Sequence, residues 1–430
     1  MDMWKEIKSC RLCESSEFEN AFSLGMQVVK DFVDSPNDSS KKGPLDLVLC
    51  KTCGFLQLRH TFSKEYLYTH YWYRSGTSPT MIYELKDIVK IASNKVNLKE
   101  GDIVIDIGAN DGTLLKQYEN ESLTKVGFEP SNLWKYGVSP GTTIINNYFN
   151  AKSFMERFPG KKAKIITSIA MFYDLDDPNG FVKDIKSILN SDGIWIVQMN
   201  YLGLMLKNLG YDNICHEHVG YYSLSTMEYL LSRHDMEIFD VALNNVNGGS
   251  FRLYIKHSSD NSKKTNTEAI YRLKATEEKL NMSKAYTYTE FSEQIKHQKE
   301  GLNSMLSELS KKGKNVLIYG ASTRGLVILE YCEIDSNVIK YATDKNSDKW
   351  GKYLSGTGIK IISLEEYRRI NPDYLLILPY QYATEIAKQE SDFLDKGGDL
   401  IIPLPKAEIL SKEELSSGNP NEFLEGYDKL

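Results

Sequence analysis

A chain of 430 residues is too long for one ordinary core, and roughly one domain per 150 residues predicts about three domains. Hydrophobic residues make up 41% and charged residues 26% of the chain, which is typical of a soluble globular protein and argues against a disordered or membrane protein. The net charge of -6 gives no electrostatic reason to expect nucleic acid as a partner. With no secretory signal core and no long apolar run, we expect a cytoplasmic protein without membrane contact.

Near the N-terminus, four of the six cysteines form two Cys-x-x-Cys pairs, Cys10 with Cys13 and Cys50 with Cys53. This spacing brings four thiolates to the tetrahedral separation that Zn(II) prefers. Four cysteine ligands leave no open coordination position, so we expect a structural rather than a catalytic zinc. The metal would supply folding energy to a small zinc-binding domain over residues 1–70.

Residues 101–118 are typical of a strand, a glycine turn and a helix, in which an apolar segment at 103–107 leads into Gly108 and Gly112. Such a turn lets backbone N–H groups meet a nucleotide-like ligand. Asp106 lies at the end of the strand and suits a ligand with a cationic amino-acid portion, without a pyrophosphate. Glu129, at the end of the next strand, suits ribose hydroxyls. Further strands at 165–170 and 194–200 indicate a doubly wound domain over residues 71–262.

This order of segments resembles the class I S-adenosylmethionine methyltransferases. The resemblance implies S-adenosylmethionine as the cofactor, with an adenine ring near residues 146–150. The cofactor contacts that we expect are Asp106, Gly108, Asn110, Gly112, Glu129, Pro130, Phe149 and Ser168. A doubly wound domain without a ligand is the alternative.

The segment at 214–224, ICHEHVGYYSL, places His216 and His218 around Glu217. The zinc-protease pattern HExxH is absent, because Gly220 stands where its second histidine is required. Alternating histidines point to opposite sides of an extended chain, so we expect one of them to face a given pocket as a general base. The alternative is a polar segment that caps a helix starting near Ser223 or Ser225.

The last third of the chain predicts a helical connector over residues 263–312, where apolar residues recur at helical spacing. Residues 313–430 then repeat the strand-turn-helix pattern with Gly320 and Gly325, and Asp344 ends the next strand. We expect a second Rossmann-like domain. NAD is disfavoured there, because the turn lacks the middle glycine that lets a pyrophosphate approach.

Taken together, the two CxxC pairs, VIDIGANDG, GFEPS, CHEHVGYYSL and NGGSFRLYI resemble the bacterial sugar C-methyltransferases, which methylate C3 of nucleotide-linked 4-keto-deoxysugars. The resemblance implies an α/β chain with a zinc-binding module, a central class I methyltransferase domain and a C-terminal Rossmann-like domain. It places His216, Glu217 and His218 in the active site, with His218 as the base. The substrate contacts that we predict are Tyr71, Tyr73, Ser75, Tyr222, Asn247, Arg252, Arg324, Tyr380, Gln381, Tyr382 and Lys406.

Two departures from the family leave the nucleotide and the sugar open. Cys215 stands where many relatives have tyrosine, and Asn247 stands where they have histidine. The chemistry needs a base beside a ketone and a donor to the enolate oxygen, which histidine, glutamate and tyrosine supply. The alternatives are a zinc-ribbon methyltransferase acting on RNA or another small molecule, and a binding protein without activity. We expect a monomer, because three domains can bury one another's surfaces.

Overall fold

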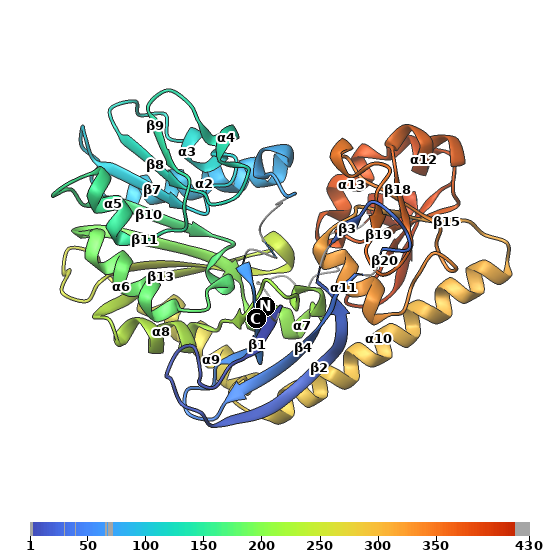
Figure 1. The fold of residues 1–430 in the computed structure, drawn as a ribbon, viewed down its shortest axis with the longest axis horizontal. Helices are drawn as coiled ribbons and strands as arrows, with labels where there is room; N and C mark the ends of the chain where they lie inside the picture. Colours follow the sequence, from blue (N-terminus) through green and yellow to red (C-terminus); the bar gives the residue numbers. More distant parts are fainter. Residues whose placement is uncertain (1–2, 30, 39, 65–66, 68–71, 418–430) are drawn as a thin grey trace.

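The computed structural model describes residues 3–29, 31–38, 40–64, 67 and 72–417. Figure 1 shows two large α/β units side by side, with the strands of the N-terminal unit below and between them. The long helix α10 (Ala285–Lys311) runs along the same lower side towards the C-terminal unit. This arrangement confirms the predicted α/β class with a small N-terminal module and two doubly wound sheets.

The N-terminal module is built on an antiparallel sheet of order β12-β5-β4-β2. Its own strands are β2 (Phe18–Val28), β4 (Lys42–Cys50) and β5 (Leu56–Leu58), while β1 (Trp4–Glu6) pairs separately with β6 (His60–Phe62). The fourth strand, β12 (Gly220–Tyr221), comes from far along the chain and pairs Gly220 with Gln57. The residues that follow the HEH segment are therefore part of the zinc-module sheet.

The central unit has a seven-stranded sheet of order β13-β14-β11-β10-β7-β8-β9. Its strands are β7 (Ile103–Ile107), β8 (Thr124–Phe128), β9 (Thr142–Ile145), β10 (Ala163–Ile169), β11 (Leu189–Asn200), β13 (Met236–Asn244) and β14 (Ser250–His257). The strands from β9 to β11 are parallel, and β14 and β13 continue the sheet in antiparallel fashion. Parallel strands covered on both faces need continuous apolar sequence, and every residue of β7 is buried, with Asp106 as its one acidic member.

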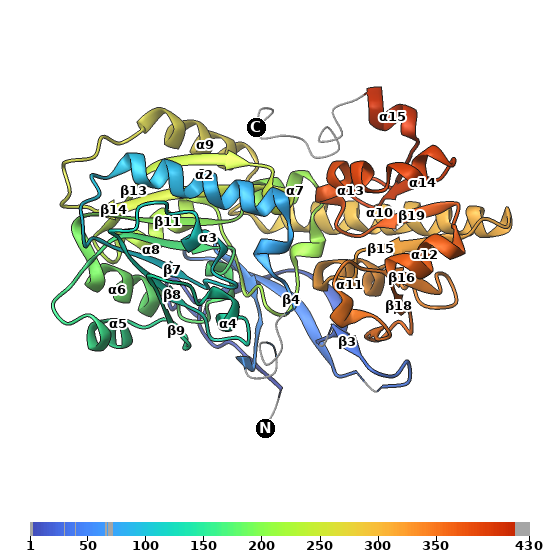
Figure 2. The same cartoon turned by 90° about the horizontal axis from the view of Figure 1, so that it is seen from above.

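Helices cover both faces of this sheet, as the view from above shows (Figure 2). They are α2 (Pro79–Lys95), α3 (Thr113–Lys116), α4 (Trp134–Gly137), α5 (Ala151–Arg157), α6 (Pro178–Ile188), α7 (Leu202–Lys207) and α8 (Leu224–Ser232). Short 3-10 turns precede, separate or follow these helices: η1 (Ser75–Thr77), η2 (Phe172–Asp174), η3 (Tyr211–Asn213) and η4 (Val246–Gly248). Several of these turns follow the carboxyl ends of strands, where ligands bind in open α/β sheets.

The C-terminal unit has an eight-stranded sheet of order β21-β20-β19-β15-β16-β18-β17-β3. Its strands are β15 (Val316–Tyr319), β16 (Tyr341–Thr343), β17 (Tyr353–Leu354), β18 (Lys360–Ile362), β19 (Tyr374–Ile377), β20 (Asp399–Ile402) and β21 (Glu408–Leu410). Its helical segments are α11 (Thr323–Tyr331), η5 (Ser347–Lys349), α12 (Leu364–Ile370), η6 (Tyr380–Tyr382), α13 (Ala383–Gln389), α14 (Ser391–Asp395) and α15 (Lys412–Ser417). The edge strand β3 (Phe32–Val33) belongs to the N-terminal module, so the first 70 residues contribute to two sheets.

The domain bounds at residues 70, 262 and 312 stay a prediction: residue 70 lies outside the described residues, and β3 and β12 pair with strands of other units. The connector consists of α9 (Thr267–Lys279) and α10, whose buried face includes Phe291, Ile295 and Leu302. Within the described part of the chain, none of the helices combines the length and apolar character needed to cross a bilayer.

The contact between α10 and the zinc module gives a first prediction. Phe291 is buried and its ring lies 5.4 Å from that of Phe22 on β2. We expect Phe291→Ala to lower the free energy of unfolding by about 3–5 kcal/mol, because truncation of a buried aromatic leaves a cavity. Tyr286→Ala, on the exposed side of the same helix, is the control and should change it by less than about 0.5 kcal/mol. Equal losses in urea unfolding would contradict the assigned packing.

Candidate active site

The four cysteines of the CxxC pairs meet at the end of the N-terminal sheet. Their sulfur atoms all lie within 4.8 Å of one another, with 3.6 Å between Cys10 and Cys53 and 3.4 Å between Cys13 and Cys50. Zinc–thiolate bonds of about 2.3 Å in a tetrahedron require sulfur separations of about 3.8 Å, so the cluster fits zinc. All four ligands come from protein, which makes this a closed structural site. The predicted zinc ligands are confirmed.

The predicted cofactor residues gather at the carboxyl ends of β7 and β8. Gly112 adopts φ 72°, and a Cβ there would lie 2.6 Å from the Gly137 Cα, so only glycine fits this turn. The Glu129 carboxylate accepts hydrogen bonds from the backbone N–H of Asn110 at 2.7 Å and of Ser131 at 2.8 Å. These contacts fix the acid of β8 against the glycine turn of β7, which is the arrangement expected for a ribose-binding acid.

Asp106 supplies a second carboxyl group beneath this turn. It is buried, and Thr167 Oγ1 donates to it at 2.6 Å. Burial raises the pKa of Asp106 to about 7, the Thr167 hydrogen bond opposes that shift, and Glu129 adds to it. A buried acid of this kind favours a cationic neighbour, which agrees with the ammonium of the amino-acid portion of S-adenosylmethionine.

The segment before α2 lies directly over the glycine turn. The Asn110 side chain accepts from the Ser75 N–H at 3.1 Å and donates to the Tyr73 carbonyl at 2.9 Å. The Gly76 N–H donates to Asp111 at 2.9 Å. Tyr73 and Ser75, predicted as sugar contacts, are thus bound through their backbones to the cofactor turn, whereas Tyr71 lies outside the described residues.

The remaining predicted cofactor residues differ in how deeply they are buried. Pro130 is exposed, and the half-buried Phe149 ring lies 5.1 Å from those of both Phe128 and Phe181. Ser168 is fully buried and accepts a hydrogen bond from the Trp195 indole at 3.1 Å. Its side chain is part of the core, and its contact with the cofactor stays a prediction.

His218 lies in a pocket beside the same sheet edge. The pocket is lined by Tyr173, Asn200, Tyr201, Leu202, Met205, Asn213, His218, Gly220 and Tyr221. Asn200 ends β11 and Tyr173 follows β10, two residues after Met171, whose side chain lies against Gly108. His218 Nδ1 is 2.7 Å from the Asn213 carbonyl, and its ring packs on Tyr173 with centroids 4.1 Å apart. The pocket therefore connects the HEH segment to the methyl-donor edge of the sheet.

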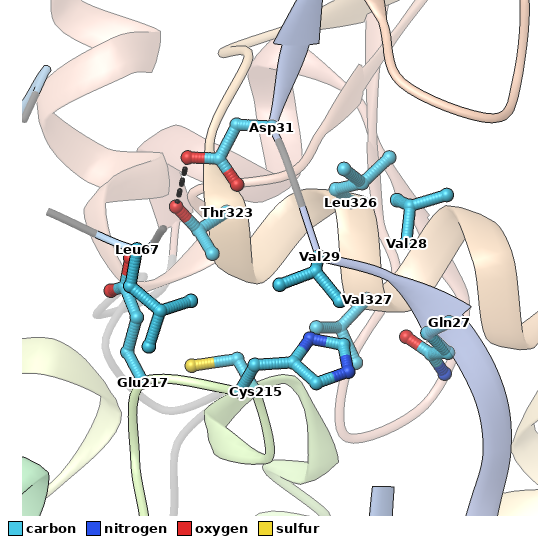
Figure 3. Close-up of a pocket in the computed structure, with 11 residues that line it drawn as sticks. Gln27, Val28, Val29, Asp31, Leu67, Cys215, Glu217, Thr323, Leu326 and Val327 are labelled. Atoms are coloured by element: carbon cyan, nitrogen blue, oxygen red, sulfur yellow. Dashed lines mark hydrogen bonds between the residues drawn. The ribbon is translucent and has the colours of Figure 1, made fainter. Parts of the chain in front are cut away.

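His216 and Glu217 face a different pocket, between the zinc module and α11. Figure 3 shows Cys215 and Glu217 on one side of it and Asp31, bonded to Thr323, on the other. His216 is buried against Phe62, with ring centroids 4.5 Å apart, and its Nε2 contacts the Gly43 carbonyl. Burial lowers the pKa of His216 to about 4. The alternation predicted from sequence is thus realised as two pockets on opposite sides of one turn.

The predicted residues of the C-terminal domain meet at the boundary with the central domain. Arg324, Tyr380 and Gln381 all donate to the carboxylate of Asp212. Tyr382 donates to the Asn247 side chain at 2.9 Å. These side chains are satisfied by the neighbouring domain, so they join the two domains in this structure. Asp344, at the end of β16, accepts from the Ala321 N–H and pairs with Lys349 within its own domain.

Three further predicted substrate contacts lie away from both pockets and stay predictions. Tyr222 lies in the core, with its ring 4.8 Å from Phe55 and 5.2 Å from Phe172. Arg252 binds Gln198, Asp87 and Glu84, and so ties α2 to β14. Lys406 extends into solvent near Glu408, with 82% of its side chain exposed. None of these three side chains lines either pocket.

Sequence reasoning missed Tyr173, Tyr221 and Asp212. Tyr221 rather than Tyr222 faces the His218 pocket, since successive residues of a strand point to opposite sides. Alternation along β12 predicts that Tyr221 and Tyr222 face opposite sides but not which of them faces the pocket, and Tyr173 follows a predicted strand end. No sequence signal identifies Asp212, because its partners come from residues 324–381.

The parallel sheet with an acid-bearing glycine turn, joined to a four-cysteine zinc module, defines a class of zinc-containing S-adenosylmethionine-dependent methyltransferases. Comparison with family models narrows this class: residues 10–68 match a zinc binding domain, 79–241 a methyltransferase domain and 245–405 a C-methyltransferase C-terminal domain. The chain is also 28% identical over 417 residues to the C-methyltransferase NovU of Streptomyces niveus, covering 96% of this chain and 99% of that one. These matches show an S-adenosylmethionine-dependent C-methyltransferase that is similar to NovU over nearly its whole length.

Solved methyltransferase structures resemble part of the chain. The mitomycin 7-O-methyltransferase MmcR is 14% identical, with a TM-score of 0.33 over 42% of this chain and 55% of that one. The plantazolicin methyltransferase BpumL, in complex with a pentazolic desmethylPZN analog and SAH, is 12% identical, with a TM-score of 0.34 over 42% of this chain and 86% of that one.

The zinc cluster gives a second prediction. Cys50→Ala should remove zinc from the purified protein and lower its thermal unfolding midpoint, because the metal supplies folding energy to the module. Metal content by mass spectrometry and calorimetry of the same sample measure both effects. Cys332→Ala, which removes a buried thiol elsewhere, is the control and should keep zinc. Full zinc content in Cys50→Ala would refute the assignment.

Glu217 gives a third prediction, on pH. Burial and the facing Asp31 carboxyl raise its pKa from 4.5 to about 8, so between these values the folded state holds a proton that the unfolded state has lost. This difference makes the wild type less stable as pH rises. Glu217→Gln cannot ionise, so its stability advantage over wild type should grow from about pH 4.5 to about pH 8. Thermal midpoints across this range measure it, with the exposed Glu119→Gln as control. A constant difference would contradict the protonated Glu217.

Proposed function

We propose that this C-methyltransferase methylates a carbon next to a ketone, C3 of a nucleotide-linked 4-keto-deoxysugar, through an enolate generated by His218. The observation that carries the proposal is the placement of His218 in a pocket at the carboxyl edge of the methyltransferase sheet, with one ring nitrogen fixed. The family resemblance of the whole chain supports the sugar substrate, and the formal charge of -6 weighs against RNA.

The ring nitrogens of His218 have different roles. Nδ1 faces the Asn213 carbonyl at 2.7 Å, and since a carbonyl only accepts, Nδ1 carries the hydrogen. The lone pair is then on Nε2, which is the nitrogen able to take a proton from carbon. Burial lowers the pKa of His218 to about 3, while the Asn213 carbonyl opposes the shift. The imidazole is therefore neutral at physiological pH, and its Nε2 carries a free lone pair.

Removal of that proton places negative charge on the ketone oxygen, which needs a hydrogen-bond donor. Tyr221 lines the same pocket, and its buried hydroxyl has no hydrogen-bond partner among the described residues. Burial raises the pKa of Tyr221 well above its ordinary value, so the phenol keeps its hydrogen and donates. The Asn200 amide, by contrast, already donates to the Asn247 carbonyl. We assign Tyr221 as the donor to the enolate oxygen.

S-adenosylmethionine, when bound, supplies an electrophilic methyl group. Asp106, Gly108, Asn110, Gly112 and Glu129 are the residues that would hold it, with the backbone of 73–76 covering the turn. The chain thus brings a base and an oxyanion donor to the edge where the methyl donor binds. Positioning of this kind accounts for a large part of the rate of a bimolecular transfer.

The fourth prediction tests His218 directly. His218→Gln should lower both methyl transfer and solvent-deuterium incorporation at the substrate carbon by about 10²–10⁴-fold, because a general base is lost. Product mass spectrometry across dTDP-, GDP- and CDP-linked 4-keto-deoxysugars, with exchange followed by NMR, measures both. His234→Gln is the matched control, since that histidine contacts Asn179 away from both pockets.

S-adenosylmethionine binding distinguishes a variant that has lost the base from one that has lost its fold. S-adenosylmethionine affinity in calorimetry should be unchanged in His218→Gln, because the cofactor turn does not contact that side chain. A wild-type exchange rate in His218→Gln would refute the base assignment. Wild-type enzyme that incorporates neither deuterium nor methyl into any keto sugar would refute the proposed substrate.

A further inference from the structure

We propose that Asp212 is a positioning residue through which the C-terminal domain fixes the orientation and tautomer of His218. This inference rests on the proposed function, because it takes His218 as the base. Asp212 lies on η3 in the central domain and is completely buried. Its side chain reaches neither the cofactor turn nor the His218 pocket, so it acts through its neighbours.

The partners of the Asp212 carboxylate all come from the C-terminal domain. Arg324 approaches through Nε at 2.8 Å and Nη2 at 2.6 Å. The Tyr380 hydroxyl donates at 3.0 Å and the Gln381 amide at 3.1 Å. A buried carboxylate is costly unless charged and polar donors satisfy it, and among the described residues these donors come from the docked C-terminal domain. The position of η3 therefore depends on that domain.

The next residue transmits this position to the base. Asn213 follows Asp212 directly, and its carbonyl is the acceptor of the His218 Nδ1–H at 2.7 Å. A displacement of η3 moves that carbonyl and removes the contact that keeps the hydrogen on Nδ1. His218 Nε2 would then carry the hydrogen in part of the molecules, and that tautomer cannot accept a proton from carbon through Nε2.

Arg324 also contacts a second segment beside the His218 pocket. Arg324 Nη1 donates to the Asn247 carbonyl at 2.7 Å, and Asn200 Nδ2 donates to the same oxygen at 2.8 Å. Asn200 lines the His218 pocket. Asn247 adopts a left-handed φ of 56°, and its side chain accepts from Tyr382. Arg324 thus binds both Asp212, whose neighbour Asn213 contacts the base, and Asn247, which contacts Asn200.

Asp212→Asn tests the inference, because it keeps the shape of the side chain but removes its charge and two acceptor positions. We expect kcat to fall about 10–100-fold with an unchanged KM for S-adenosylmethionine, as for a base misplaced by a fraction of an ångström. In full-length protein with ¹⁵N-labelled histidine, NMR should show His218 changing from a single Nδ1–H tautomer to a mixture. His218→Gln identifies the resonances. Arg324→Lys keeps the charge but cannot bridge Asp212 and Asn247, so it should have the same two effects. It replaces Asp212→Asn as the test variant if Asp212→Asn does not fold.

Glu330→Gln is the matched control on the same α11 helix. Its side chain is 6% exposed and joins the C-terminal domain to the zinc module, accepting from the Val28 N–H at 2.7 Å. It should keep wild-type kcat and the Nδ1–H tautomer. An unchanged His218 tautomer and kcat in both Asp212→Asn and Arg324→Lys, with His218→Gln inactive, would overturn the positioning role and leave the base intact. An active His218→Gln would instead overturn the proposed function.

Discussion

The pairing of β12 with β5 is the constraint on which the candidate active site depends. Gly220 pairs with Gln57 and Tyr221 with Leu56, while the Leu58 N–H donates to the Val219 carbonyl. These backbone bonds attach the residues after the HEH segment to the zinc module. The turn that carries His216, Glu217 and His218 is therefore attached to the zinc module as well as to the central domain. A Cβ on Gly220 would lie 2.6 Å from the Phe55 ring, so this close approach explains the glycine that breaks the HExxH pattern.

The zinc site acts on this turn at short range. Gln57 is fully buried, donates its side-chain amide to Cys10 Sγ at 3.2 Å, and pairs through its backbone with Gly220. A closed zinc site leaves no coordination position for a reactant, and here it contacts the strand with which the candidate catalytic segment pairs. The contact gives the metal module a structural purpose in an enzyme whose zinc ion has four protein ligands and no open coordination position.

The two pockets beside the HEH turn differ in character. His218 and Tyr221 line the pocket beside the methyltransferase sheet, where burial keeps the imidazole neutral and the phenol protonated. Glu217 and Asp31 face each other on the other side, where burial raises the pKa of both carboxyl groups. Burial is the common cause, since it disfavours the charged form of histidine, tyrosine and carboxyl groups alike.

The sequence by itself determined the local features: the four zinc ligands, the glycine turn with Asp106 and Glu129, the doubly wound sheets and the opposite directions of His216 and His218. Each follows from spacing within a short segment, because a turn or a strand fixes its own geometry. Only the tertiary structure decided that Tyr221 and not Tyr222 lines the pocket, that Ser168 and Arg252 are held in the core, and that Arg324 reaches Asp212. Along the chain these partners are separated by 27 residues for Ser168 and Trp195 and by 112 for Asp212 and Arg324, and nothing in either segment of a pair specifies its partner before the chain packs.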